Sequence, residues 1–146
     1  MFNIKYEIIS DQLNDVKGIT EEEIHYNFLL GNLFLFTPKA EIEMEWEWIP
    51  LLDFAYCLKK VVSTLKISNI VKECFEFTEN AETLEFSRQS EKLKIIASFS
   101  SIVVETTFAD FEQAVFDFHI SISEYIRGNI SNDPPGVLQK YLSVKV

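Results

Sequence analysis

The chain has 146 residues, of which 47% are hydrophobic and 13 are phenylalanine. This length and composition suit one domain, over residues 1–146, with a substantial core. The formal net charge is −10, from 23 acidic and 13 basic residues, which disfavours binding to nucleic acids or anionic membranes and favours encounter with a basic partner.

Strand patterns dominate the first quarter of the chain. Residues 2–9 alternate between apolar and polar side chains, as a half-buried strand does. The apolar run over residues 24–30 predicts a second strand. Gly31 and Asn32 then predict the two-residue turn of a hairpin, whose return strand covers residues 33–36.

Residues 41–48 read Glu-Ile-Glu-Met-Glu-Trp-Glu-Trp, an unbroken alternation that predicts a strand over residues 40–48. Successive side chains of a strand point to opposite faces, so the glutamates share one face and the apolar residues share the other. We expect Ile42, Met44 and Trp46 to be mostly buried, and the glutamates mostly exposed. Same-face carboxylates would lie roughly 7 Å apart and repel one another.

Two amphipathic helices and a meander of strands complete the chain. Pro50 fits a first helical turn, after which apolar side chains recur at three- and four-residue spacing for about four turns. Four alternating segments between residues 74 and 108 predict an antiparallel meander. Asp110 and Gln113 predict the N-terminal cap of a second long helix that ends at Gly128. This order predicts an α+β fold: one antiparallel sheet with two main helices packed on one face.

Motifs for catalysis or cofactor binding are not evident. The four glycines are scattered singly, without a phosphate-binding loop or a Gly-x-Ser-x-Gly elbow. His25 and His119 lack the paired ligand spacing of a zinc site, so we expect no metal and no cofactor. Cys57 and Cys74 predict reduced core thiols rather than a disulfide. We therefore predict a protein that is not an enzyme.

The glutamates of residues 41–48 have two interpretations. They are either the solvated face of an ordinary strand or a docking face for a basic protein, with Trp48 as an interface aromatic at the strand end. A second acidic group precedes them in the sequence. The candidate partner-binding residues are Glu41, Glu43, Glu45, Glu47, Glu21, Glu22, Glu23 and Trp48.

One stretch of the chain carries a resemblance to a known class of proteins. It reads Trp46-Glu47-Trp48-Ile49-Pro50-Leu51-Leu52-Asp53-Phe54 and leads into a helix. With the late helix over residues 111–125, it resembles the small acidic immunity proteins that neutralise bacterial polymorphic or contact-dependent toxins. The resemblance lies in size and style over most of the chain. It implies tight one-to-one binding that occludes a basic toxin, such as a nuclease, and it carries over no individual binding residue.

Two other functions remain open. The chain could be a small-ligand-binding or enzymatic α+β domain with a Phe-rich apolar pocket between sheet and helices. It could also self-associate through an exposed strand edge or helix face, so both a monomer and a homodimer are compatible with the sequence. The alternating N-terminus predicts no signal peptide, and no apolar run approaches the roughly 20 residues of a membrane span. We therefore expect a cytoplasmic protein.

Overall fold

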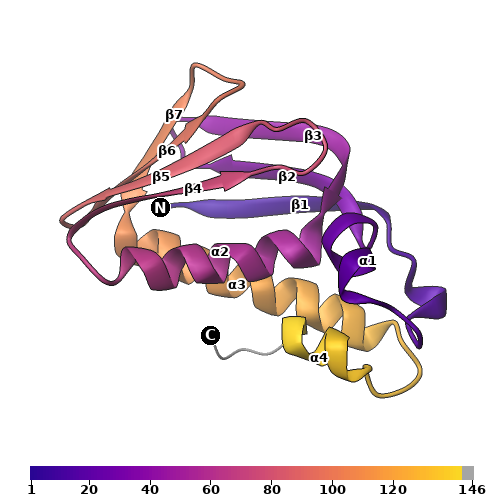
Figure 1. Ribbon diagram of the computed structural model, residues 1–146. Helices are drawn as coiled ribbons and strands as arrows, with labels where there is room; N and C mark the ends of the chain where they lie inside the picture. The colour runs from indigo at the N-terminus through magenta and orange to yellow at the C-terminus, as the bar shows by residue number, and fades with distance from the viewer. Residues whose placement is uncertain (143–146) are drawn as a thin grey trace.

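A computed structural model describes residues 1–142, apart from the side chain of Asp15. Its helices and strands confirm the α+β class. In chain order the elements are β1 (Asn3–Ser10), the 3-10 turn η1 (Leu13–Asp15), α1 (Glu21–Tyr26), β2 (Leu30–Phe36), β3 (Glu41–Pro50), α2 (Leu51–Leu65), β4 (Ile70–Glu76), β5 (Thr83–Gln89), β6 (Lys92–Ala97), β7 (Val103–Thr107), α3 (Phe108–Gly128) and α4 (Gly136–Leu142) (Figure 1).

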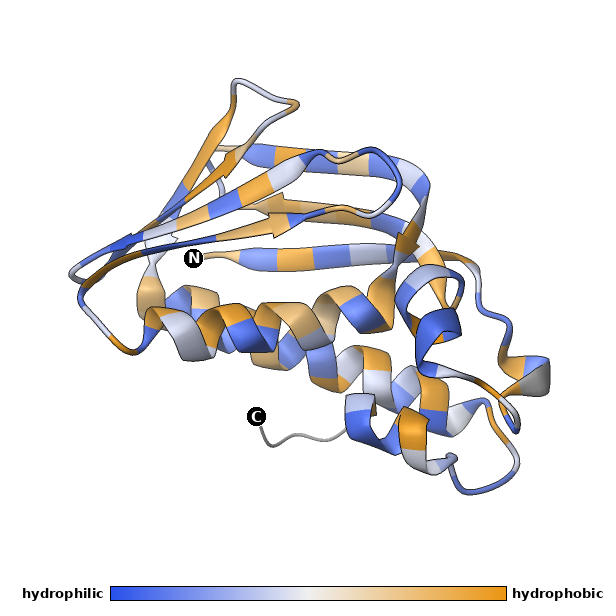
Figure 2. Ribbon diagram, viewed as in Figure 1, coloured by the Kyte–Doolittle hydropathy of each residue, from blue (hydrophilic) through white to orange (hydrophobic). Residues whose placement is uncertain are grey.

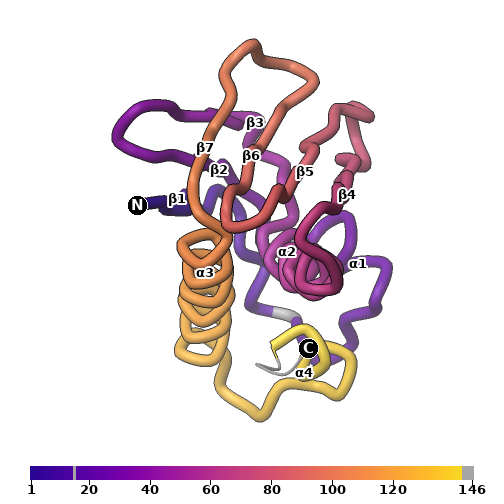
Figure 3. The backbone as a smooth tube through the Cα atoms, turned by 90° about the vertical axis from the view of Figure 1, so that its left-hand side faces the viewer, coloured from indigo at the N-terminus to yellow at the C-terminus, as the bar shows by residue number. Residues whose placement is uncertain are grey.

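The strands pair antiparallel, as predicted, but they divide into two sheets. Sheet A has the order β1-β2-β3, and sheet B has the order β4-β5-β6-β7. Both sheets lie on the same side of the two long helices, α2 and α3, which pack against each other (Figures 1 and 3). Helix α2 follows β3 directly and carries the chain away from sheet A. Strand β4 therefore begins a separate sheet, which approaches sheet A through contacts between β7 and β3.

One contiguous core fills the space between the sheets and the helices. Hydrophobic and hydrophilic residues alternate along several of the strands (Figure 2), and in a strand such alternation directs every second side chain to the same face. Phe54 and Leu58 of α2 and Phe111 and Phe118 of α3 are buried in this core. The three- and four-residue spacing of the apolar side chains thus gives each helix one buried stripe.

The two tryptophans of β3 connect the sheets. Trp46 stacks on Trp48, with ring centroids 5.4 Å apart and planes at 15°. The edges of the Trp46 ring system also meet Phe77, which follows β4, at 5.0 Å and Phe99, in the β6–β7 connection, at 4.8 Å. Both tryptophans are half-buried, so these contacts form one wall of the core at the opening between the sheets.

Residues 21–36 differ from the sequence-based prediction. Helix α1 occupies the start of the predicted second strand, because Thr20 and Glu23 form a capping box. The Glu23 backbone N–H donates to Thr20 Oγ1 at 3.1 Å, and the Thr20 backbone N–H donates to Glu23 Oε1 at 3.1 Å. The predicted turn at Gly31 is also wrong, since Gly31 lies inside β2. A Cβ atom there would stand 1.9 Å from the backbone oxygen of Glu7, so glycine permits close strand approach rather than a turn.

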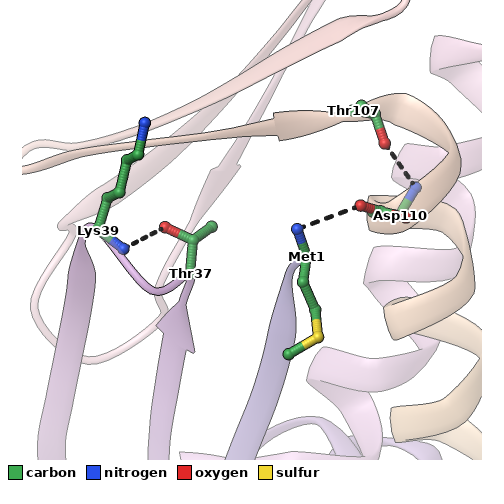
Figure 4. A network of polar contacts seen from close by, with 5 residues as sticks. All are labelled: Met1, Thr37, Lys39, Thr107 and Asp110. Carbon is green, nitrogen blue, oxygen red and sulfur yellow. Dashed lines mark hydrogen bonds and ion pairs between the residues drawn. The ribbon is translucent and has the colours of Figure 1, made fainter.

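Other local predictions need smaller corrections. Helix α3 is capped by Thr107, whose Oγ1 accepts a hydrogen bond from the Asp110 backbone N–H at 3.1 Å, so Asp110 lies in the first turn (Figure 4). Pro50 ends β3 and occupies the N-cap position of α2. Cys74 is exposed on β4 rather than buried, whereas Cys57 is half-buried, and both are free thiols.

Candidate binding surface on sheet A

Sheet A has a core side and a solvent side, which we call the outer face of sheet A. Strand register places Lys5 opposite Phe34 and Phe34 opposite Glu43, so these three side chains form one row across the outer face. The neighbouring row runs from Asn3 through Phe36. The outer face comprises Asn3, Lys5, Glu7, Asn32, Phe34, Phe36, Glu41, Glu43, Glu45 and Glu47.

The glutamates of β3 lie where the alternation placed them. We call Glu41, Glu43, Glu45 and Glu47 the acidic row. Glu41 is half-buried and the other three are exposed, whereas Ile42 and Met44, on the opposite side, are fully buried. The predicted strand is confirmed, and so are its two faces, except that Glu41 and Trp46 are both half-buried. Strand β3 is also an edge of sheet A, paired only with β2.

The charge of the outer face is unbalanced. The outer face carries five carboxylates, which are the four of the acidic row and that of Glu7 on β1. Lys5 is the one basic side chain on this face, so the formal charge of the face is −4. The Lys5 ammonium lies 5.4 Å from the centre of the Phe34 ring. Among the described residues, no ion pair involves a glutamate of the acidic row.

A bulge interrupts β3 within the acidic row. Met44 pairs with Leu33 and Ile49 pairs with Gly31, so four residues of β3 span the length of one residue of β2. Within the bulge Glu47 takes a left-handed conformation, with φ of 67°.

The buried side chain of Asn32 holds this bulge in place. Its Oδ1 accepts a hydrogen bond from the Glu47 backbone N–H at 2.8 Å, and its Nδ2 donates to Glu7 Oε1 at 3.1 Å. Both ends of a buried amide are thereby satisfied. Asn32 thus fixes the positions of both Glu7 and Glu47 on the outer face.

Two phenylalanines stand at the centre of this acidic face. Phe34 is only 8% exposed although it lies on the solvent side, and Phe36 is half-buried. The sequence analysis missed both as site residues. The available signal was the run of four apolar residues over 33–36, since a strand with one polar face would alternate. Central position in sheet A, between β1 and β3, explains the apolar character of both faces of β2.

The remaining candidate residues lie elsewhere. Trp48 contacts Trp46 and, at 6.3 Å between ring centroids, Phe77, so it faces sheet B rather than the glutamates. Glu21, Glu22 and Glu23 belong to α1, at the Pro50 end of β3. Glu21 pairs with Lys140 of α4 at 3.2 Å, and Glu23 completes the capping box. The structure therefore gathers the acidic row with Glu7, and it gives two of the three α1 glutamates local partners.

A histidine–aspartate–cysteine cluster lies between α1 and α2. His25 Nδ1 is 3.0 Å from Asp53 Oδ2, and the same oxygen is 4.0 Å from Cys57 Sγ. Burial raises the pKa of Asp53, and burial together with the Asp53 charge raises the pKa of Cys57 to about 12. The carboxylate stands between the thiol and the imidazole, so this arrangement keeps the thiol protonated rather than activating it. The cluster joins α1 to the first turn of α2.

Among residues 1–142, no group of three or more His, Cys, Asp or Glu side chains could hold a metal ion. No helix of that part of the chain is long and apolar enough to cross a membrane. Comparisons with protein-family models, curated proteins and solved structures return no match.

Proposed function

We propose that the chain is a protein-binding module whose outer face of sheet A binds a basic protein. One observation carries the proposal: Phe34 and Phe36 lie between strands that bear five carboxylates and one lysine. In protein interfaces desolvated aromatic side chains supply much of the affinity, and the surrounding charges set the association rate and the choice of partner. The half-buried Phe36 is the ring that a partner would cover, since Phe34 is already buried in the chain itself. Because Asn32 holds Glu7 and Glu47 in place, part of the charged rim is preorganised.

The most specific form of this proposal is an immunity protein that acts in the bacterial cytoplasm. It would bind a basic toxin one to one and occlude its active site or a surface the toxin needs. Proteins that bind nucleic acids present lysine and arginine to phosphates, so a nuclease toxin would offer a surface complementary to the acidic row. The net charge of −10 would accelerate the encounter at low ionic strength.

The packing of the aromatic side chains argues against a Phe-rich ligand pocket. Phe54 is 1% exposed, and Phe86 and Phe111 are fully buried in the continuous core. Phe54 stacks on Phe77 at 5.7 Å, and Phe86 contacts Phe111 at 5.5 Å. These rings pack against one another rather than line a pocket, so the small-ligand-binding or enzymatic alternative has less support.

The test begins with the protein encoded immediately upstream of this gene. Its C-terminal domain is expressed alone and together with the chain. We expect growth arrest in the first case, rescue in the second and a one-to-one complex by sedimentation. Failure of rescue together with absence of a complex would refute the immunity proposal.

The contribution of the outer face is then measured by stopped-flow association with that domain. A variant in which the acidic row is changed to glutamine should associate at least tenfold more slowly at low salt, and added salt should reduce the difference. The control variant makes the same change in net charge at four exposed glutamates outside sheet A. These are Glu76, Glu79, Glu91 and Glu124. Equal rates for the two variants would place the binding site elsewhere.

A further inference from the structure

A groove runs along the free edge of β1, beside α3. Strand order leaves β1 paired only with β2, and α3 lies next to its other edge (Figures 1 and 3). A cavity of about 410 Å³ lies between the first residues of β1 and the first half of α3. A second cavity of about 530 Å³ follows the last residues of β1 as far as Tyr125. Both volumes fall within the range of ligand-binding clefts.

The two cavities adjoin at Tyr6. Tyr6 of β1 lines both of them. Its hydroxyl lies 2.6 Å from Ser121 Oγ of α3, and its ring packs on Phe118 at 5.6 Å. At the far end the Tyr125 hydroxyl donates a hydrogen bond to Asp11 Oδ2 at 2.9 Å. We call this feature the β1–α3 groove.

Aspartate side chains line both cavities of the β1–α3 groove. Asp110 and Asp117 line the first cavity and Asp11 lines the second. Within the described chain, no lysine, arginine or histidine side chain lines either cavity. The positive group present is the amino group of Met1, 3.4 Å from Asp110 Oδ2 (Figure 4). The Gln113 amide donates to Asp117 Oδ1 at 3.0 Å and orients that carboxylate.

We propose that the β1–α3 groove binds an extended, lysine- or arginine-bearing segment of a protein partner. The free edge of β1 offers backbone hydrogen-bonding groups of the kind that extended peptides recognise. The carboxylates of Asp110 and Asp117 bind the cationic side chains, and the alternate side chains of the segment rest on the half-buried Ile4. The inference does not rest on the acidic row, since no glutamate of that row lines the groove.

The test uses a capped heptapeptide, Lys-Val-Lys-Val-Lys-Val-Lys, titrated into the ¹⁵N-labelled chain. We expect saturable shifts of backbone amides in residues 2–10 and 110–121. The exposed Asp117→Lys substitution should weaken binding at least tenfold. Glu79→Lys makes the same charge change in the exposed β4–β5 turn and should weaken it less than twofold. Ala114→Trp, which fills the first cavity, should abolish the shifts in residues 2–6.

Three results would overturn the inference. The shifts could map to the acidic row, or the two lysine variants could weaken binding equally, which would mean nonspecific attraction to a protein of net charge −10. A peptide with glutamate in place of lysine could also bind as well as the basic one. If Ala114→Trp fails to fold, the comparison of Asp117→Lys with Glu79→Lys still decides, because both positions are exposed.

Discussion

The solvent-facing sides of the two sheets show the same alternation of apolar and polar residues, but they differ in the balance of positive and negative side chains. On sheet B the outward-facing positions of the strands carry three lysines and three glutamates, and two ion pairs form there. Lys72 pairs with Glu85 at 3.4 Å, and Lys94 pairs with Glu105 at 3.8 Å. The outer face of sheet A carries five glutamates and one lysine. The positive and negative charges of sheet B therefore balance, whereas the outer face of sheet A keeps an excess of negative charge that would attract a basic molecule.

Strand register causes this difference. In sheet B, Lys94 stands directly opposite Glu105, where opposite charges attract across neighbouring strands. In sheet A, Phe34 stands between Lys5 and Glu43, so the cation meets an aromatic ring instead of a carboxylate. Two sheet faces with the same alternation can thus differ in charge balance, because the register decides whether oppositely charged side chains become neighbours.

The largest effect is expected from removing the aromatic centre of sheet A. Phe34→Ala should lower the free energy of unfolding by about 2–3 kcal/mol, because the ring is mostly buried between β1 and β3. Ile96→Ala, at a 38% exposed position of sheet B, should cost about 0.5 kcal/mol. Urea denaturation of both variants measures the difference. Equal losses would show that Phe34 is an ordinary surface residue.

The next largest effect concerns the residue that holds the bulge. Asn32→Ala should cost about 1–2 kcal/mol, since it removes a buried amide and leaves the part-buried Glu47 N–H without its acceptor. Ser87→Ala, at a half-buried position on the outer side of β5, should stay within about 0.5 kcal/mol of the unchanged chain. Thermal unfolding of the pair tests this. A loss at Asn32 no greater than that at Ser87 would mean that the bulge holds without the amide.

Replacing glutamates by glutamine should change the free energy of unfolding in opposite directions on the two sheets. Changing the acidic row to glutamine should stabilise the chain by about 1 kcal/mol at low salt, because it relieves repulsion between carboxylates roughly 7 Å apart. Changing Glu85 and Glu105 of sheet B to glutamine should destabilise it by about 0.5–1 kcal/mol through loss of two exposed ion pairs. Both effects should shrink in 1 M salt. Effects of the same sign would contradict the comparison.

The smallest effect tests the backbone at the end of the acidic row. Glu47→Gly should stabilise the chain by about 0.5 kcal/mol, since glycine adopts the left-handed conformation without the steric cost that glutamate bears. Glu45→Gly, two residues earlier in the same bulge, should instead destabilise by about 0.5–1 kcal/mol, because Glu45 has no positive φ for glycine to relieve. Chemical denaturation at matched salt distinguishes the two. Destabilisation at both positions would argue against the strained conformation of Glu47.

The sequence by itself determined the elements whose signal is local. Alternation over residues 41–48 sets which side chains of β3 reach water, and the apolar spacing sets the buried stripes of α2 and α3. Both follow from the geometry of one strand or one helix. This basis also places four of the eight candidate residues, those of the acidic row, on one face of β3.

Only the tertiary structure decided how these elements meet. The sequence pattern predicts a turn at Gly31, but this residue lies within a strand. Glycine is needed there because the backbone of Glu7 passes where a side chain would be. Phe34 belongs to the candidate binding surface because β1 and β3 flank β2. The strands form two sheets because α2 leads the chain away from β3. Pairing and register depend on contacts between residues far apart in the chain. A local pattern determines which face of a strand is buried, but it does not determine which strand lies beside it.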